Sequence, residues 1–336
     1  MLMQGDYGNA FVDGMMYNNT FGYHTLNYWQ YVDYFSPWHG AASQNTPVDL
    51  HDWYYENDPE TNRGWEKRYF EFGVLNIPNP AYTNAAHRNG VKSIACLYFD
   101  QYYRPGQTIN ELFAMDEDGT FPVAEKLIEM AEYFGYDGYF FNAEEAVYTE
   151  YGNRKKQFLA RLADAGLWTQ YYDTNSSMNA SKAEWLKYDI DGDGELEKIQ
   201  DSVFVNYGWP GSIDTQLKWI ADNGYDPYKQ VFYGVENNQG GFSGGHSSAG
   251  NIERLYTNED GTKNLKASVA LFTPSDHYQR GLDGTKLQNT NYQWMIAERE
   301  RMFFSGVKCD PTDTGDQAGY SRPDVEVSNA GGWPGV

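Results

Sequence analysis

The chain has 336 residues, which is enough for one large α/β barrel or two average domains. It carries 25 Lys and Arg against 47 Asp and Glu, and the net charge of −22 disfavours binding to nucleic acid or to an anionic membrane surface. No apolar run approaches the roughly 20 residues of a membrane span, no segment is typical of a signal peptide, and the 2 cysteines cannot form a zinc site.

Eight short apolar or aromatic runs are expected to form strands, because most of them are separated by helix-like or loop-like segments. In chain order they are 1–5, 28–35, 93–99, 138–142, 167–172, 202–208, 231–236 and 268–274.

Helical periodicity is clearest in 120–135, where apolar residues recur every three or four positions. Thr120 is the expected N-cap of this helix and Gly135 its expected stop. The same pattern returns in 153–165, and a last helix is expected at about 290–305.

Strands that alternate with helices and number eight predict an α/β fold, a (β/α)8 TIM barrel. The segment 36–80 has the composition of a long loop excursion, and no repeat or low-complexity linker divides the chain. The chain begins on its first expected strand and stops soon after its last expected helix. We therefore expect residues 1–336 to be a single catalytic barrel domain cut from a longer multidomain protein.

Aromatic residues make up 17% of the chain, with 29 Tyr and 10 Trp. Barrel strands account for part of this excess. The rest stands beside Asn, Asp and Gly in loop-like segments, where aromatic rings can stack on the apolar faces of sugars. Carbohydrate is therefore the expected partner.

Polar and aromatic side chains follow several expected strands, at the end where a TIM barrel places its active site. Strand ends are often polar, but carboxylates, amides and phenols on so many consecutive strands favour a site. These candidates are Asp100, Asn142, Glu144, Tyr172, Asp173, Asn206, Tyr207, Glu236 and Asp276.

The segment DGYFFNAEEA, 137–146, is the most specific of these strand ends. Because side chains alternate along a strand, Asn142 and Glu144 are expected to point the same way. Ordinary glycosidases use two carboxylates, whereas an amide can neither attack carbon nor take up a proton. An amide beside an acid suits a substrate that supplies its own nucleophile, such as a 2-acetamido sugar whose carbonyl oxygen attacks C1 and forms an oxazoline. Asn142 would orient the acetamido group, and Glu144 would act first as acid and then as base.

This segment resembles the fourth-strand motif of glycoside hydrolase family 85, the endo-β-N-acetylglucosaminidases, with its Asn-x-Glu pair. It is also related to the family 18 chitinase signature, which has Asp where Asn142 stands. The family 85 resemblance extends along most of the chain. It includes NYWQYVDYFSPWHG, NIPNPAYTNAAHRNGVKSIACLYFD, TFPVAEKLIEMAEYFGYDGYFFN, TQYYD and VFVNYGW.

Two positions depart from the family pattern. Tyr171 replaces the usual Trp of Q-W-Y-D, and Glu236 with Asn237 stands where Asp and an apolar residue are common. These changes affect the sugar subsites and the preferred glycan, and they leave the Asn-x-Glu pair intact.

The resemblance implies hydrolysis of the GlcNAc-β1,4-GlcNAc core of N-linked glycans with retention, a capacity for transglycosylation, and no required cofactor. It implies that Glu144 is the general acid/base, that Asn142 holds the acetamido nitrogen, and that Tyr172 hydrogen-bonds the acetamido group. It also implies that Phe99, Asp100, Asn206, Tyr207 and Trp209 line the sugar subsites. We expect a secreted or cell-surface protein of bacterial type, with a cytoplasmic location left open, that acts on glycoproteins or released oligosaccharides.

Asp173 and Glu236 leave a second mechanism open, because either could be the carboxylate nucleophile of a conventional glycosidase. We favour Asp173 as a residue that orients Tyr172 or a bound water, and Glu236 as a hydrogen-bond partner of the sugar, and we place both among the substrate-binding candidates. Two other functions also stand: a family 18-like chitinase or endoglycosidase, and a glycan-binding barrel without activity. The presence of Glu144 favours an enzyme.

The segment DIDGDGELEKIQD, 189–201, raises the hypothesis of a structural calcium ion. Asp189, Asp191 and Asp193 occupy the first, third and fifth positions of an EF-hand loop. Gln200, however, replaces the bidentate Glu of position twelve, and no pair of EF helices is expected. An Asp- and Gly-rich turn without an ion is the alternative.

Overall fold

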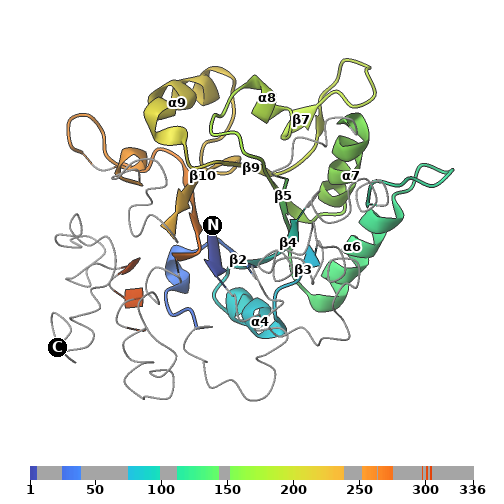
Figure 1. Ribbon diagram of the computed structural model, residues 1–336, viewed down its shortest axis with the longest axis horizontal. Helices are drawn as coiled ribbons and strands as arrows, with labels where there is room; N and C mark the ends of the chain where they lie inside the picture. Colours follow the sequence, from blue (N-terminus) through green and yellow to red (C-terminus); the bar gives the residue numbers. More distant parts are fainter. Residues whose placement is uncertain are drawn as a thin grey trace, which may run out of the picture.

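The computed structural model describes residues 1–5, 25–38, 75–98, 112–143, 152–237, 252–262, 264–274, 297, 300–301 and 303–304. In this part of the chain, eight parallel strands close into a barrel with helices on its outside (Figure 1). The predicted α/β fold, a (β/α)8 TIM barrel, is confirmed.

The barrel strands follow one another around the ring in chain order, and β11 pairs with β1 to close it. They are β1 (Leu2–Gly5), β2 (Tyr34–Trp38), β4 (Lys92–Tyr98), β5 (Gly138–Asn142), β6 (Trp168–Tyr172), β9 (Ser202–Val205), β10 (Val231–Glu236) and β11 (Ser268–Phe272). A short strand, β3 (Leu75–Asn76), pairs antiparallel with β4.

The helices lie between successive strands in the chain and around the barrel in space (Figure 1). They are α4 (Pro80–Arg88), α6 (Pro122–Phe134), α7 (Gly152–Asp164), α8 (Ala180–Ala183) and α9 (Ile213–Asp222), with 3-10 turns η2 (Trp29–Tyr31), η6 (Trp209–Ser212) and η7 (Ile252–Leu255). Strands β7 (Lys187–Tyr188) and β8 (Glu197–Lys198) form a small separate sheet in the connection between β6 and β9.

Side chains of each barrel strand alternate between the interior and the helix layer, as the period of a strand requires. The interior holds one aromatic and aliphatic cluster drawn from all eight strands, for example Phe140, Tyr172 and Phe204. The residues between them, such as Phe141 and Tyr171, pack outward against the helices in a second cluster. The parity of a residue in its strand therefore decides whether its side chain faces the interior.

The predicted strand 28–35 is wrong in its first half. Trp29–Tyr31 forms the 3-10 turn η2, and β2 begins only at Tyr34. The Trp29 ring packs on Phe35 at a centroid distance of 5.1 Å, so a turn buries this aromatic residue where we expected an extended chain.

The two best-patterned helices appear close to their predicted bounds, as α6 and α7. Gly135 ends α6 in the left-handed conformation, with φ of 76°. The expected cap at Thr120 is wrong: Phe121 is the N-cap residue and makes no side-chain cap bond, and Pro122 starts the helix with its fixed φ.

Other predictions fall partly outside the described residues. Of the predicted helix at 290–305, residues 297, 300, 301, 303 and 304 are described and are helical. Of the predicted loop 36–80, residues 39–74 lie outside the description. Among the described helices, none has the length and apolarity needed to cross a bilayer.

Candidate active site

The carboxyl ends of β5 and β6 bring Asn142 and Tyr172 side by side. Each is the last residue of its strand, and the two are direct partners in the parallel pairing. Tyr172 belongs to the interior cluster, and Asn142 shares the inward parity of Phe140. Asn142 is 3% exposed and Tyr172 6% exposed. Two of the three predicted catalytic residues therefore meet inside the barrel at the end where TIM barrels carry their sites.

The amide oxygen of Asn142 is buried and accepts no hydrogen bond. The backbone beside it is fixed, because Ala143 N donates to Tyr172 O at 2.9 Å. A buried acceptor without a partner costs about 1–3 kcal/mol. Such an acceptor is suited to a ligand that supplies an N–H or O–H donor.

A continuous series of aromatic rings extends from Tyr172 around this end of the interior. Phe204 meets Tyr172 edge-on at 5.0 Å and Tyr207 at 5.9 Å. The ring centroids of Tyr207 and Phe272 are 6.1 Å apart, and those of Phe272 and Trp38 are 5.3 Å apart. Tyr207, Phe272 and Trp38 are partly exposed, so they offer surfaces on which a sugar could stack.

Gly234 makes room for these rings. A Cβ atom at this position would lie 2.3 Å from the Phe204 ring and 3.0 Å from the Tyr207 ring. Two residues later, β10 ends at Glu236, which shares the inward parity of Phe232 and is 4% exposed. We call Asn142, Tyr172, Tyr207 and Glu236 the inner rim.

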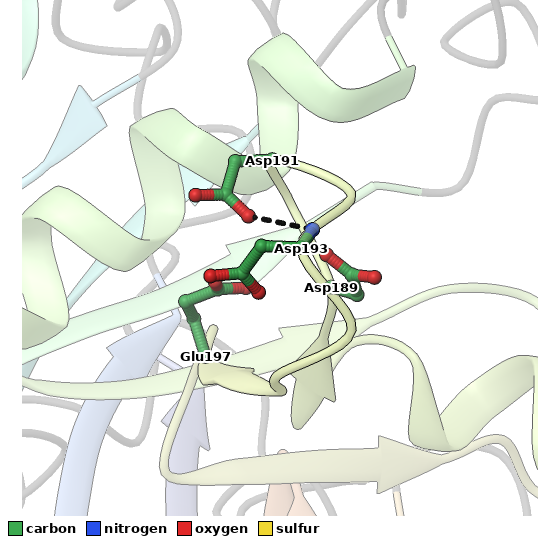
Figure 2. A group of neighbouring side chains, drawn as sticks. All are labelled: Asp189, Asp191, Asp193 and Glu197. Carbon is green, nitrogen blue, oxygen red and sulfur yellow. Dashed lines mark hydrogen bonds between the residues drawn. The ribbon is translucent and has the colours of Figure 1, made fainter.

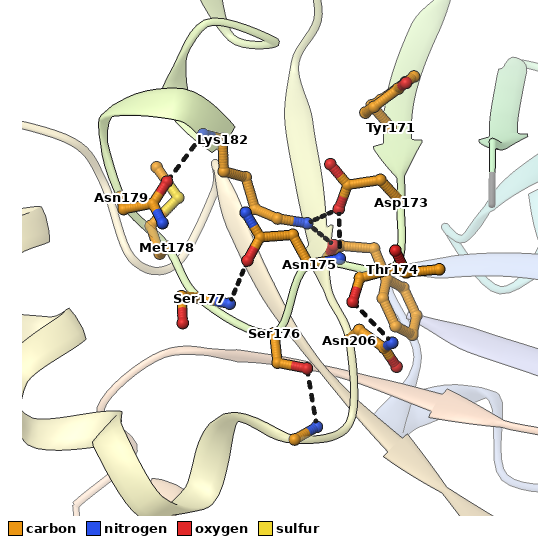
Figure 3. Close-up of polar contacts among 12 residues, drawn as sticks. Tyr171, Asp173, Thr174, Asn175, Ser176, Ser177, Met178, Asn179, Lys182 and Asn206 are labelled. Carbon is orange, nitrogen blue, oxygen red and sulfur yellow. Dashed lines mark hydrogen bonds and ion pairs between the residues drawn. The ribbon is translucent and has the colours of Figure 1, made fainter. Parts of the chain in front are cut away.

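The carboxylate of Asp173 is engaged by the loop that follows β6 (Figure 3). Its Oδ1 accepts hydrogen bonds from Lys182 Nζ at 2.6 Å and from Asn175 N at 3.0 Å. Burial lowers the pKa of the Lys182 ammonium, and the Asp173 carboxylate acts in the opposite direction. The parity that turns Tyr172 inward turns its neighbour outward, and an ion pair then holds the carboxylate in the loop.

The side chains of Asn206 and Trp209 are also engaged within the protein. Asn206 Nδ2 donates to Thr174 O at 3.0 Å. Trp209 is 0% exposed, and its Nε1 donates to Gly234 O at 2.7 Å. The expectation that Trp209 lines a sugar subsite disagrees with this burial, because η6 folds its indole into the outer cluster against Tyr233.

Four sequence candidates lie outside the described residues. They are Phe99, Asp100, Glu144 and Asp276. Their roles stay predictions.

Among the described residues three lysines are buried, Lys155, Lys156 and Lys182, and the sequence analysis missed them. Lys155 Nζ donates to Tyr171 Oη at 2.5 Å, and burial lowers the pKa of this ammonium to about 7. Its position in α7 is three residues before Phe158, on the same helical face, and this spacing was the signal available in the sequence. No comparable spacing marks Lys182.

The partly exposed aromatic residues Trp38 and Phe272 were also missed as site residues, although both stand at the ends of apolar runs. Trp38 ends β2 and Phe272 ends β11. In a TIM barrel the carboxyl end of a strand is where ligand-facing side chains gather. Their positions at strand ends could therefore have identified them.

The acidic segment forms a compact group on the surface (Figure 2). One carboxylate oxygen from each of Asp189, Asp191, Asp193 and Glu197 lies within 4.8 Å of the others. Glu197 was absent from the predicted set. Backbone N–H groups already bind this turn, since Asp189 Oδ2 accepts from Gly194 N at 3.0 Å. These oxygens have the chemistry that calcium requires, and the ion stays a prediction.

Comparison with solved structures supports the fold. A glycoside hydrolase domain from Streptococcus pneumoniae R6, Spr0440 Endo-D, aligns with 86% of this chain and 42% of that chain at a TM-score of 0.56 and 21% identity. At this identity the likeness concerns the barrel alone.

Curated relatives are similar in sequence over most of this chain. Cytosolic endo-beta-N-acetylglucosaminidase 2 of Arabidopsis thaliana is 26% identical over 239 residues, 69% of this chain and 32% of its own length. The cytosolic endo-beta-N-acetylglucosaminidase of Danio rerio is 26% identical over 263 residues, 76% of this chain and 34% of its own length. The chain thus spans about a third of the length of these relatives.

The expected secreted or cell-surface location is contradicted by these comparisons, because the relatives from Arabidopsis thaliana, Danio rerio and Mus musculus are all named cytosolic. The barrel and site motifs bear on the fold and the reaction, and they contain no signal for a compartment.

The model of glycosyl hydrolase family 85 matches residues 8–330, nearly the whole chain, so that the sequence motifs, seven of the eight barrel strands and the Asn142–Tyr172 pair lie within one family's pattern. The chain belongs to glycosyl hydrolase family 85.

Proposed function

We propose that this chain carries endo-β-N-acetylglucosaminidase activity and cuts the GlcNAc-β1,4-GlcNAc bond in the core of N-linked glycans. The observation that carries the proposal is the buried, unpartnered amide oxygen of Asn142 beside Tyr172, in a chain of family 85. The names of the curated relatives support the same activity.

The first step forms an oxazoline ring on the substrate in its N-protonated, oxazolinium form, because the acetamido proton stays on nitrogen. The acetamido carbonyl oxygen attacks C1 while Asn142 Oδ1 accepts a hydrogen bond from the acetamido N–H, which raises the electron density on the attacking oxygen. Tyr172 hydrogen-bonds the same group and holds it in line with C1. The bond from C1 to the leaving oxygen breaks, its electrons pass to that oxygen, and Glu144 supplies the proton.

The second step opens the ring with retention. The Glu144 carboxylate takes a proton from water, whose oxygen attacks C1 from the face that the leaving sugar vacated. The bond between C1 and the oxygen of the oxazoline ring breaks, its electrons return to that oxygen, and the acetamido group is restored. A hydroxyl of a GlcNAc acceptor in place of water gives transglycosylation by the same route.

The surroundings of the carboxylates support a nucleophile that belongs to the substrate. Asp173, one of two candidates for a conventional nucleophile, is bound by Lys182 at 2.6 Å. Glu236 lies on the inner rim, and we assign it hydrogen bonding to the sugar.

The test is incubation with a panel of N-glycoproteins, followed by mass spectrometry of the released glycans. A free glycan with a single GlcNAc at its reducing end is the expected product. Glu144→Gln should lower the rate by about 10²- to 10⁴-fold, because the leaving oxygen then lacks its proton donor. Glu184→Gln, which alters an exposed carboxylate bound to Lys156, is the matched control and should cut normally.

Three outcomes would contradict the proposal. Cleavage of chitin oligomers without release of N-glycans would favour a family 18-like activity. Glycan binding without cleavage would favour a silent barrel. Undiminished hydrolysis by Glu144→Gln would reject Glu144 as the acid.

A further inference from the structure

A buried ammonium joins the ends of two neighbouring barrel strands beside the inner rim. Lys182 is 0% exposed, and its Nζ donates to Asp173 Oδ1 at 2.6 Å and to Phe204 O at 2.8 Å (Figure 3). Asp173 directly follows the last residue of β6, and Phe204 lies in β9. One side chain therefore connects the carboxyl end of β6 to that of β9.

Both attachment points adjoin residues of the site. Tyr172 immediately precedes Asp173 in the chain, and the Phe204 ring contacts both Tyr172 and Tyr207. A shift of the Phe204 backbone relative to Asp173 would therefore change the separation of two inner-rim phenols.

The connection is reinforced on the Asp173 side. Asp173 Oδ1 also accepts Asn175 N at 3.0 Å, and Asn175 O accepts Asn206 N at 3.1 Å. The side chain of Asn179 accepts Lys182 N at 3.0 Å and so starts α8, which aims the lysine inward. Gly208 N donates to Ser176 Oγ at 3.2 Å, which binds the same two loops further out.

Burying an ammonium is unfavourable in the absence of close acceptors, and burial does lower the pKa of Lys182. A loop that needed only to be held in place could use neutral bonds such as those of Ser176. The charged group occurs where the loop meets both strand ends, at Asp173 and at Phe204 O.

We propose that Lys182 is a positioning residue: its ammonium fixes the end of β6 against the end of β9 and thereby sets the placement of Tyr172 and Tyr207 around the acetamido sugar. This inference rests on the proposed function. Lys182 touches no substrate in this scheme. Its effect is expected in kcat, because it sets the geometry of the reacting group while the rest of the glycan binds elsewhere on the protein.

The experiment measures kcat and KM of Lys182→Met on a fluorescently labelled asparagine-linked glycan, well below the melting temperature of the variant. We expect kcat to fall about 10- to 100-fold, since a displacement of about 1 Å in a reacting group has effects of this size. KM should stay within about threefold of wild type. The matched control is Lys156→Met, which removes another buried ammonium, one in α7 that is bound to the exposed Glu184 at 2.9 Å. Its kcat should stay within about twofold.

Several outcomes would overturn the inference. An unchanged kcat in Lys182→Met would do so, and so would an equal fall in Lys156→Met, which would indicate general destabilisation. If Lys182→Met does not fold, Lys182→Gln replaces it: its shorter, neutral amide cannot reach both oxygens, and an unchanged kcat would again reject the role. A wild-type protein that cuts no glycan would instead reject the proposed function, and this inference with it.

Discussion

The neighbouring tyrosines of β6 show how differently the two faces of one strand are used. Tyr172 faces the interior beside Asn142, whose amide oxygen has no partner. Tyr171 faces the helix layer, where its hydroxyl accepts a hydrogen bond from Lys155 at 2.5 Å and its ring stacks on Trp185 at 4.0 Å. Both residues are tyrosines, and they differ only in occupying consecutive positions of the strand, whose side chains point to opposite faces.

The comparison sets a polar group that is left open against one that is satisfied. On the outer face the hydroxyl of Tyr171 is satisfied by Lys155. On the inner rim a buried acceptor is left open at a cost in stability. Changes on the inner rim should therefore alter rate, and changes on the outer face should alter stability.

The largest effect is expected from Asn142→Ala. This variant tests whether the amide oxygen of Asn142 orients the acetamido group whose carbonyl oxygen is the nucleophile. Hydrolysis of natural glycans should fall about 10²- to 10³-fold, because the acetamido group is no longer oriented. The same variant, given a prepared glycan oxazoline and a GlcNAc acceptor, should still build the glycosidic bond. Both reactions can be followed by chromatography of one labelled glycan.

A conventional nucleophile predicts the opposite result. Cleavage would survive Asn142→Ala, and a covalent adduct of sugar and protein, on Glu236 or Asp173, could be trapped and detected by intact mass. Detection of that adduct would reject the oxazoline mechanism.

The paired variants Tyr172→Phe and Tyr171→Phe sharpen the comparison within one strand. Loss of the inner hydroxyl should lower kcat about 10-fold and leave the melting temperature nearly unchanged. Loss of the outer hydroxyl should leave kcat unchanged and cost about 1–2 kcal/mol in the free energy of unfolding, because the buried Lys155 loses an acceptor. Equal effects of the two variants on kcat would contradict the division of the faces.

The buried Lys155 should make the outer face sensitive to pH. Its pKa is about 7 in the folded protein against an ordinary value of 10.5, so between these values the unfolded chain binds the proton more tightly. The resulting penalty is absent above about pH 10.5, grows as the pH falls, and is complete below about pH 7.

Urea unfolding of Lys155→Met and wild type should therefore diverge by about 3 kcal/mol in favour of the variant between about pH 9.5 and pH 7, and the difference should then level off. Lys218→Met, an exposed lysine paired with Asp222 at 2.6 Å, controls for loss of a positive charge. A difference that does not vary with pH would show that Lys155 stays protonated on folding.

The smallest effect is expected at the acidic group of Figure 2. If calcium binds there, a chelator should lower the melting temperature by a few degrees, about 1 kcal/mol, and added calcium should restore it. Asp191→Ala should remove this response, because one of four clustered carboxylates is lost. A melting curve that a chelator leaves unchanged would identify the segment as a turn without an ion.

The sequence by itself determined the barrel and the neighbouring positions of Asn142 and Tyr172 inside it. Alternating strands and helices predict the (β/α)8 topology, and the end of the run Tyr139–Asn142 already places an amide at the carboxyl edge. Period and strand order carry this information, because neighbouring parallel strands align their ends at one edge of the sheet. The inward parity of Asn142 and Tyr172 follows from the same period.

Only the tertiary structure decided which polar groups were left open and which were satisfied. Asp173 and Trp209 read as site residues in the sequence, yet one is bound by Lys182 and the other is buried against Tyr233. Lys155 and Lys182 were not singled out in the sequence, yet both are buried. The partners that settle these cases are up to 25 residues away in the chain, as between Trp209 and Gly234. Such contacts depend on the conformation of the loops that follow the strands. The local pattern of residues does not determine that conformation.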